Sequence, residues 1–234
     1  MTIVFEKPQV TYIGYTDSCD LNMLLLGLDA NLDPHLDRGA ESVIEFAGRA
    51  CYQSFHRPNP ATANVDDYIR NIIAQGHESV LEHATVTYYI EGVSRAFTHE
   101  LVRHRHFNYS QLSQRFVDES EARFIVPPAL RGNDVAENLL KVQAKNALIA
   151  YSDLVDTLQN DGVPRKQARE AARAVLPNNI ETKIVVTGNH RAWREFLNRR
   201  LDPAADAEMR EVAKLIYNDL SVLYPSMYED IQHV

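Results

Sequence analysis

The sequence predicts a mixed α/β domain that is rich in helices and built around a small sheet. Segments whose apolar residues recur at helical spacing alternate with short runs of β-branched and aromatic residues. Hydrophobic residues make up 45% of the 234 positions and charged residues 24%, the balance of an ordinary folded protein. The length suits one large domain or two small ones, and no internal repeat or low-complexity linker divides it. The order of the strands does not follow from these patterns.

In the first half of the chain, the elements follow from apolar spacing and from helix breakers. Val43 and Ile44 fall on one side of a helix, and a stretch with two prolines separates this helix from the next. The most strand-like segment is a row of six β-formers that begins at Thr85. Ser94 then stands where the N-cap of a helix belongs. We therefore expect strand 10–15, helices 41–52 and 65–74, strand 84–92 and helix 96–103.

In the second half, prolines mark several boundaries. A short strand ends at Pro127, a helix starts at Pro164, where proline is tolerated, and Pro177 ends that helix. Between the first two of these prolines, apolar residues such as Val135 and Val142 recur at helical spacing and predict one long helix. We expect strand 123–126, helix 135–158, a helix between Pro164 and Pro177, strand 182–187, and helices from 189 or 190 to 201 and over 207–223.

Charge and composition exclude several classes of protein. The formal net charge of −8 argues against a general attraction to nucleic acids or acidic lipids. The longest apolar stretch, 21–28, is far shorter than the ~20 residues of a membrane span, and the first residues lack a signal-peptide pattern. We therefore expect a cytoplasmic protein. The two cysteines, Cys19 and Cys51, cannot supply a disulfide framework or a Cys-rich zinc site. Cys51 is expected to pack in the core.

The most unusual segment covers residues 103–115 and reads RHRHFNYSQLSQR. Three arginines, two histidines, two serines and two glutamines stand within it, although the protein as a whole is acidic. Guanidinium groups bind phosphate oxygens in pairs, and hydroxyl and amide groups can complete such a cradle. The segment therefore suits an anionic, aromatic ligand. Composition leaves two alternatives open, a solvated charged surface and a basic RNA-binding stripe.

Further arginines and histidines extend this interpretation. Arg165, Arg169 and Arg173 recur every four residues, so they line one side of a helix. Because no matching acidic set accompanies them at helical spacing, we expect an anionic partner. His77 and His83 stand six apart rather than the four of a zincin, so we expect no metal site. The chain contains no P-loop and no G-x-G-x-x-G, so side chains must hold any nucleotide or flavin.

Residues 103–115 resemble the signature of the flavin-dependent thymidylate synthases, R-H-R-x7-S, in which Ser113 is the final serine. The loop from Ser110 to Arg115 is similar to the actinobacterial version. Three other segments resemble segments of the family in the same order along the chain, and they are GHES with EH in 76–83, RAVLP in 173–177, and NHR through FLNRR in 189–200. On these matches the chain is identified as a member of this family.

The resemblance implies both a fold and a reaction. The fold is a single domain over residues 1–234, a small antiparallel sheet flanked by helices, assembled as a homotetramer whose sites are built from several subunits. The reaction is the methylation of dUMP to dTMP. Its carbon donor is 5,10-methylenetetrahydrofolate and its hydride donor is FAD reduced by NADPH, with no cysteine nucleophile. No nucleic-acid or membrane partner is expected.

Residue by residue, the resemblance implies two sets of contacts. The FAD contacts are Ser79, Arg103, His104, Arg105, Gln111, Asn189, His190, Arg191 and Glu195. The dUMP contacts are Glu100, Leu101, Val102, Arg103, Gln111, Leu112, Ser113, Gln114, Arg115, Arg173 and Arg200. Arg115 and Arg173 are expected to clamp the phosphate. Arg200, the expected catalytic residue, places a permanent cation beside the pyrimidine and favours its N3-ionised form. Two positions depart from the family pattern, because Glu195 stands where Asn or His is common and Phe116 replaces a tyrosine.

Two other classes of function compete with this interpretation. A basic-loop RNA-binding protein needs a broad positive surface with exposed aromatic residues for stacking, and the net charge of −8 argues against it. A His-rich metal hydrolase would hold zinc and lose its activity in a chelator. The presence or absence of a flavin spectrum separates all three.

Overall fold

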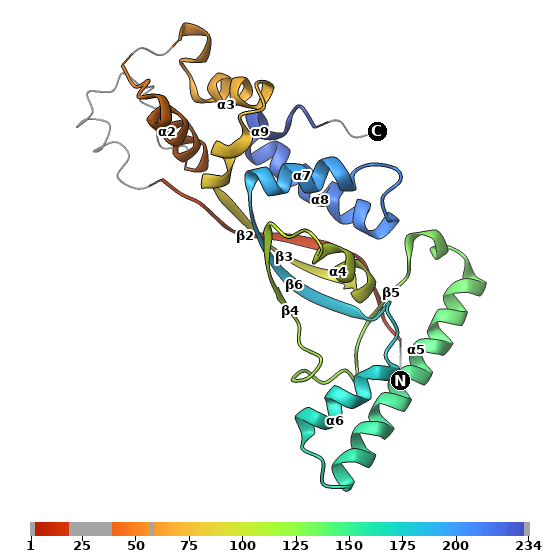
Figure 1. Ribbon diagram of the computed structural model, residues 1–234. Helices are drawn as coiled ribbons and strands as arrows, with labels where there is room; N and C mark the ends of the chain where they lie inside the picture. The colour runs from red at the N-terminus through yellow and green to blue at the C-terminus, as the bar shows by residue number, and fades with distance from the viewer. Residues whose placement is uncertain (1–2, 19–38, 57–58, 232–234) are drawn as a thin grey trace.

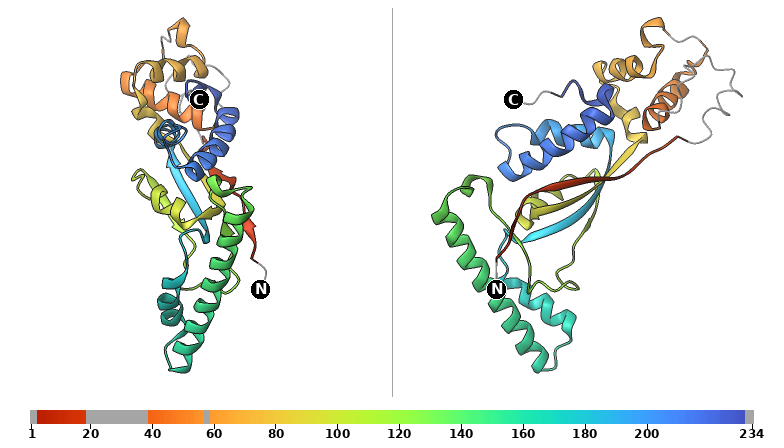
Figure 2. Two further views of the ribbon diagram at one scale, coloured as in Figure 1. Left: turned by 90° about the vertical axis from the view of Figure 1, so that its right-hand side faces the viewer. Right: turned by 180° about the vertical axis from the view of Figure 1, so that it is seen from behind.

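The computed structural model of the chain describes residues 3–18, 39–56 and 59–231. Figure 1 shows an elongated molecule with a sheet in the middle. Helices α2 (Ala40–Tyr52) and α3 (Val65–Ala74) lie at one end, and helices α5 (Asp134–Asn160) and α6 (Arg165–Ala172) project at the other. The views in Figure 2 show this projecting arm, α5 with α6, from two further sides. The apolar stretch 21–28 and Cys19 lie outside the described residues.

The central sheet has four strands, and each pairs antiparallel with its neighbours. Their order is β2 (Gln9–Tyr15), β3 (Thr85–Ser94), β6 (Glu181–Asn189) and β4 (Phe107–Gln111). Buried and half-buried residues alternate along β3 and β6, because successive side chains of a strand point to opposite faces. Two short strands, β1 (Phe5–Glu6) and β5 (Phe124–Ile125), form a separate parallel pair. The expected helix-flanked antiparallel sheet is confirmed.

The core lies where α4 (Arg95–Leu101), α7 (His190–Arg200) and α8 (Ala207–Leu223) pack on this sheet. Trp193 of α7 is fully buried there, and its ring centroid lies 4.4 Å from that of Phe107 and 5.4 Å from that of Tyr88. Its Nε1 donates a hydrogen bond to the carbonyl of Val86, at 3.2 Å. A Cβ at Gly188 would come within 2.2 Å of the Phe107 ring, so only glycine fits beneath it. These contacts fix α7 to the strands that carry the residues of the signature.

Two of the helices that hold expected site residues begin at caps that the sequence makes recognisable. Ser94 Oγ accepts a hydrogen bond from the Phe97 amide at 3.0 Å, as expected for the start of α4. Asn189 Oδ1 accepts from the Ala192 amide at 2.8 Å at the start of α7. Both caps follow directly on a strand, so the chain turns from the sheet into each helix without a loop.

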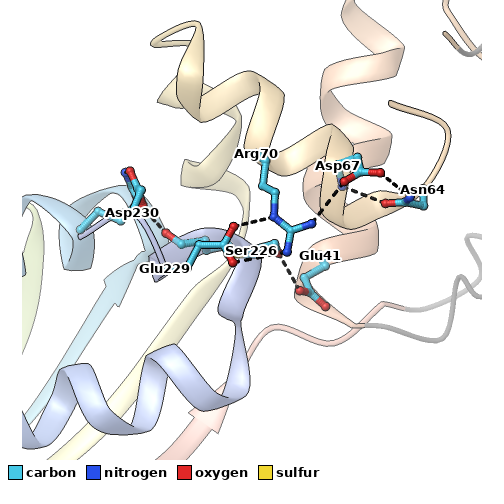
Figure 3. Close-up of polar contacts among 9 residues, drawn as sticks. Glu41, Asn64, Asp67, Arg70, Ser226, Glu229 and Asp230 are labelled. Atoms are coloured by element: carbon cyan, nitrogen blue, oxygen red, sulfur yellow. Dashed lines mark hydrogen bonds and ion pairs between the residues drawn. The ribbon is translucent and has the colours of Figure 1, made fainter. Parts of the chain in front are cut away.

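The end of the chain is tied to α2 and α3 by polar contacts (Figure 3). Arg70 Nε donates to Glu229 at 2.5 Å, and an Arg70 amine donates to Asp67 at 3.2 Å. Ser226 Oγ of the short helix α9 (Pro225–Tyr228) donates to Glu41 at 3.2 Å. The Arg70 contacts lie at the surface, where each contributes little, whereas the Ser226 contact is buried.

Most expected elements are confirmed with small shifts at their ends. Helices α3 and α8 have the expected bounds. Strand β3 extends two residues further than expected at its end, and β6 extends one residue further at its start and two at its end. The strand expected over 123–126 is only Phe124–Ile125. Strands β1 and β4 and helix α9 were not expected. The described residues also form four 3-10 segments, which are η1 (Pro60–Thr62), η2 (Glu78–His83), η3 (Pro128–Leu130) and η4 (Arg173–Val175).

The expectation that Cys51 packs in the core is wrong. Cys51 is exposed, and Tyr52 beside it is 75% exposed. Helix α2 does bury one side, with Ile44 fully buried and Arg49 2% exposed, but Cys51 and Tyr52 at its end are exposed. A helical pattern identifies the face of a residue and not how far along the helix the neighbouring structure reaches.

Candidate functional site

The arginine-histidine segment lies at the turn between α4 and β4. Helix α4 ends at Leu101, and β4 begins at Phe107, whose ring is buried against Trp193. The Tyr109 hydroxyl lies 2.7 Å from the carbonyl oxygen of Leu101 and 2.8 Å from that of His104. Tyr109, from the strand that follows the turn, therefore closes the turn. Arg103 and Arg105 within the turn are both exposed.

A cavity of about 450 Å³ opens between this turn and α7. A second cavity of about 210 Å³ shares His106, Ala192 and Glu195 with the first, so the two adjoin. The first is lined by Arg103, His104, Arg105, His106, Phe107, Ala192, Glu195, Arg199 and Arg200, and the second adds Glu82, Asn189 and Arg191. Six of the nine residues expected to contact FAD thus meet in one hollow, although they come from two distant parts of the sequence.

Arg200 is held in this hollow by two acceptors. Its Nε donates to His104 Nε2 at 3.0 Å, and one of its amines donates to Glu100 Oε2 at 3.1 Å. Burial, together with the nearby charges of Arg200 and Arg199, lowers the pKa of His104 to about 4. His104 is therefore neutral at physiological pH, so that its Nε2 can accept this hydrogen bond. The guanidinium group of Arg200 is therefore oriented by the neutral His104 and the anionic Glu100.

The guanidinium groups of Arg103 and Arg105 stand in contrast to that of Arg200. Within the part of the chain that the structure describes, neither side chain has a hydrogen-bond or ion-pair partner. Glu195, which departs from the family pattern, lies 2.7 Å from Arg199 and forms an ion pair with it. Its negative charge is thus offset within the helix, and the hollow stays cationic overall.

A third cavity, of about 430 Å³, lies on the other side of α4. It is lined by Arg95, Ala96, Thr98, His99, Glu100, Val102, Gln111 and Asn178. Gln111 Nε2 donates to Thr98 Oγ1 at 3.0 Å and to Thr182 Oγ1 at 3.2 Å, which fixes the amide. Glu100 lines this cavity and also bonds Arg200, so it links the third cavity to the first.

The loop after β4 docks on α6. Arg115 lies 2.6 Å from Glu170, and Arg169 donates to Asp118 at 2.5 Å and to the carbonyl of Phe116 at 2.6 Å. The anionic partner of Arg169 is therefore a carboxylate of the chain itself, Asp118, and not a ligand. Arg173, one turn further on, has no ion-pair or hydrogen-bond partner for its side chain among the described residues.

Several expected contacts have buried side chains. Leu101 is 1% exposed, Gln114 5% and His190 0%, so their side chains are almost fully covered in this structure. His190 instead lies with Nδ1 2.8 Å from the hydroxyl of Tyr228. Ser79 is exposed on η2 and lines none of the three cavities. Among the described residues, no three His, Cys, Asp or Glu side chains gather where they could hold a metal ion.

Several residues that line these cavities were not assigned to a site by sequence reasoning, among them Glu82, His106, Arg199 and Arg95. Glu82 bonds Arg191 at 2.5 Å and brings η2 to the second cavity. Glu82 lies in segment 76–83, and the resemblance of this segment to the family could have indicated a site residue there. His106 and Arg199 stand next to assigned residues, so proximity in sequence could have found them. Arg95 carried no signal, because a single arginine before a helix is common.

The arrangement as a whole suits phosphate-bearing, planar ligands. Unpaired guanidinium groups in a hollow bind phosphate oxygens bidentately, and His104 and Phe107 supply ring surfaces next to them. A dinucleotide such as FAD, with its diphosphate and flat rings, fits this set of donors. Among the described residues, no helix is long and apolar enough to pass through a lipid bilayer.

Comparison with known proteins gives one consistent match. The family model described as thymidylate synthase complementing protein matches residues 35–226. The flavin-dependent thymidylate synthase of Mycobacterium tuberculosis strain H37Rv is 49% identical over 201 residues, covering 83% of this chain and 80% of the relative. A protein of the same name from Mycobacterium bovis matches equally well. One from Mycobacterium sp. strain JLS is 48% identical over 205 residues, covering 83% of this chain and 81% of that protein.

Proposed function

Because this chain belongs to the flavin-dependent thymidylate synthases, we propose that the cavities around α4 and α7 are its FAD and dUMP sites. The chain is an enzyme that methylates dUMP to dTMP, and FAD is its cofactor. The observation that carries the assignment of the sites is that Arg103 and Arg105, which line the first cavity, have no hydrogen-bond or ion-pair partner among the described residues. NADPH as reductant, methylenetetrahydrofolate as carbon donor and a cytoplasmic location complete the proposal.

The two adjoining cavities suit FAD. Arg103 and Arg105 would hold the diphosphate with charge-assisted hydrogen bonds, and Asn189 has an amide nitrogen left after its oxygen caps α7. Arg191 is oriented toward the second cavity by Glu82. When bound and reduced, FAD supplies the hydride that completes the methyl group. The protein's part is to bind and orient it and to keep the hollow cationic.

The third cavity, with the loop after it, suits dUMP. Gln111 has its amide nitrogen occupied by two threonines, so its oxygen is the group left to read a base or sugar donor. Ser113 and Arg173 would provide a hydroxyl and a guanidinium group for the phosphate. Arg115, which pairs with Glu170 at 2.6 Å, would turn from that carboxylate to the phosphate when dUMP binds. Glu100 lines this cavity and accepts a hydrogen bond from Arg200, so Arg200 would lie beside the pyrimidine.

Arg200 acts through its fixed charge. A cation held next to the pyrimidine lowers the free energy of the N3-ionised ring and of negative charge that develops on it. His104 and Glu100 keep the guanidinium in position before substrate arrives, so little reorganisation is needed at the moment of reaction. His104 is neutral, which avoids a second buried cation competing for the same partners.

The function is tested directly by spectrum and product. Purified protein should be yellow, bleach with NADPH in the absence of air, recolour on aeration and form dTMP from dUMP and methylenetetrahydrofolate. A colourless protein that takes up no added FAD would refute the proposal. A protein that binds zinc and is inactivated by a chelator would favour the metal hydrolase.

The phosphate clamp predicts a selective loss. Arg115→Ala and Arg173→Ala should each weaken dUMP binding by one to two decades, since each removes a charge-assisted hydrogen bond of about 1.5–3 kcal/mol. Isothermal titration with dUMP and with deoxyuridine measures this. Deoxyuridine, which lacks the phosphate, should bind weakly and be nearly indifferent to either change. Arg165→Ala, at an exposed arginine that begins α6, is the matched control. Equal losses for both ligands would contradict the clamp.

A tetramer is supported by an unusual feature of α5. The residues Val135, Leu139, Val142 and Ile149 form a stripe that is 47–72% exposed, while Ala144, Leu148, Tyr151 and Val155 on the other side are buried. A row of exposed apolar residues on one long helix is typical of a surface that another subunit covers. We propose that this stripe contributes to the subunit contacts of the homotetramer.

Placing a charge on this stripe should disrupt assembly. Val142→Glu is expected to shift the protein to smaller species in sedimentation at micromolar concentration, because a buried unpaired carboxylate is costly. Val222→Glu, at a residue of α8 that is 79% exposed, is the control and should leave the assembly unchanged. Unaltered sedimentation of Val142→Glu would remove the stripe from the interface.

A further inference from the structure

Tyr109 joins the end of α4 and the turn after it to the central sheet. It lies on β4, where its partner across the sheet is Val186 of β6. Its hydroxyl lies 2.7 Å from the carbonyl oxygen of Leu101, the last residue of α4, and 2.8 Å from that of His104, in the middle of the turn. A phenol has a single hydrogen to donate, so the two carbonyl oxygens share it. One hydroxyl group therefore anchors both the helix end and the turn.

The turn has few means of holding its shape by itself. Residues 102–106 read VRHRH and include none of the glycine, proline, asparagine, aspartate or serine residues that stabilise turns locally. None of them has the positive φ of a helix-ending glycine. Within the turn, the His104 amide donates to the Leu101 carbonyl at 3.0 Å, and the Phe107 amide donates to the His104 carbonyl at 3.4 Å. Tyr109 binds these same two carbonyl oxygens, so it holds the acceptors on which the turn depends.

The charges around the first cavity favour opening of the turn. Of the nine residues that line this cavity, four are arginines and one is a glutamate. That glutamate, Glu195, is paired with Arg199, and neither Arg103 nor Arg105 has an ion-pair partner in the described part of the chain. Before an anionic ligand binds, the cations on the turn and on α7 repel one another. The turn therefore needs an anchor that does not depend on the ligand.

His104 extends the effect of this anchor to Arg200. Its carbonyl is held by Tyr109, and the centroid of its ring lies 5.2 Å from that of Phe196, edge to face. Nε2 of the same ring accepts the hydrogen bond from Arg200 Nε at 3.0 Å. A shift of the His104 backbone would therefore move one of the two acceptors that orient Arg200.

We propose that Tyr109 is a positioning residue, whose hydroxyl holds the turn in the shape that binds FAD and, through His104, holds Arg200 in place for the reaction. This inference rests on the proposed function, in which Arg103 and Arg105 bind FAD. Tyr109 lines none of the three cavities, so it acts without touching a ligand. Without the hydroxyl the turn would also occupy other shapes, and the apparent affinity for FAD would fall with the fraction that keeps the binding shape.

Tyr109→Phe tests this, because it removes the hydroxyl and keeps the ring. Titration of the FAD-free full chain with FAD should show binding about three- to tenfold weaker, the range of one hydrogen bond. In the same FAD-free protein, hydrogen exchange at the amides of His104 and Phe107 should be faster than in the wild type. At saturating FAD and folate, kcat for dTMP formation should fall by about three- to tenfold with the KM for dUMP within about twofold, since Arg200 acts on the transition state.

Two further variants distinguish positioning from a general loss of stability. Tyr12→Phe is the matched control, because Tyr12 is also half-buried and its hydroxyl bonds that of Tyr224 at 2.7 Å, on β2 and outside the three cavities. It should lower Tm about as much as Tyr109→Phe and leave FAD affinity, kcat and exchange of the turn unchanged. Replacing Tyr109 with 4-aminophenylalanine supplies an amine whose N–H groups can serve both carbonyl oxygens. This variant should bind FAD within about twofold of the wild type.

The outcomes separate this inference from the proposed function. If Tyr109→Phe binds FAD as the wild type does, or if Tyr12→Phe loses as much affinity, the hydroxyl of Tyr109 is only structural and the inference is wrong. An unchanged kcat at saturating FAD would overturn the link to Arg200. If Tyr109→Phe does not fold, the 4-aminophenylalanine variant still decides, since a folded variant with tenfold weaker FAD binding would refute the donor role. If Arg103→Ala binds FAD as tightly as the wild type, the proposed FAD site itself is refuted.

Discussion

Replacing Arg200 with alanine should lower dTMP formation at saturating dUMP by about 10² or more, the scale of losing one preorganised electrostatic stabiliser. FAD binding and NADPH oxidation should persist, because Arg103 and Arg105 remain to hold the cofactor. The structure favours a loss in turnover rather than in affinity, since His104 and Glu100 orient the guanidinium before substrate binds. The measurement is the rate of dTMP formation at saturating dUMP and folate, beside the flavin spectrum.

Two variants sharpen this result. Arg200→Lys should recover little, because a compact ammonium cannot bond to His104 and Glu100 at once with the same geometry. Cys51→Ala should retain near wild-type turnover and, since Cys51 is exposed, near wild-type stability. A folded, flavin-loaded Cys51→Ala without activity, beside an active Arg200→Ala, would overturn this mechanism and indicate a thiol nucleophile.

The largest effect on stability is expected at Trp193. Trp193→Ala should lower the free energy of unfolding by about 3–5 kcal/mol, as for other buried aromatic truncations. The ring contacts Phe107, Tyr88 and Phe196 and is fully buried, so its removal leaves a cavity between α7 and the sheet. For a domain of this size the loss corresponds to a fall in Tm of roughly 6–20 °C.

Thermal unfolding of the FAD-free and FAD-bound protein checks this, and both should shift. Trp193→Phe is the conservative comparison and should recover much of the loss, although it leaves the Val86 carbonyl without its donor. Val222→Ala, at an exposed position of α8, should change Tm by less than about 2 °C. A Tm of Trp193→Ala within that margin would show that the contact of α7 with the sheet does not limit stability.

Local signals were sufficient for much of the fold. The caps at Ser94 and Asn189 depend on side chain and backbone only three residues apart, so the starts of α4 and α7 could be predicted. Strand β4 could not, because its residues are largely polar. Only pairing with β6 reveals that Phe107 is buried while Asn108 and Ser110 are exposed. The polarity of an edge strand resembles that of a loop.

The candidate site, like the fold, could be predicted from the sequence only in part. Family resemblance identified Arg103, Arg105 and Arg200, but their meeting depends on contacts across 96 positions of the chain. Arg95 could not be found from the sequence, because the feature that distinguishes it is its place in the lining of the third cavity. That feature exists only after α4 and β4 have come together.

The order of the central sheet also determines how the chain must fold. Strands β3 and β6 pair through residues 100 positions apart, as Thr87 and Thr187 do. The intervening chain includes the arm of α5 and α6, whose contacts are local in sequence. Closing so long a loop is entropically costly, and each halving of the effective loop length lowers that cost by about 0.6 kcal/mol. An arm that forms first as a helical hairpin shortens the loop that β3 and β6 must close. We therefore expect the sheet, and with it the cavities around α4 and α7, to form late in folding.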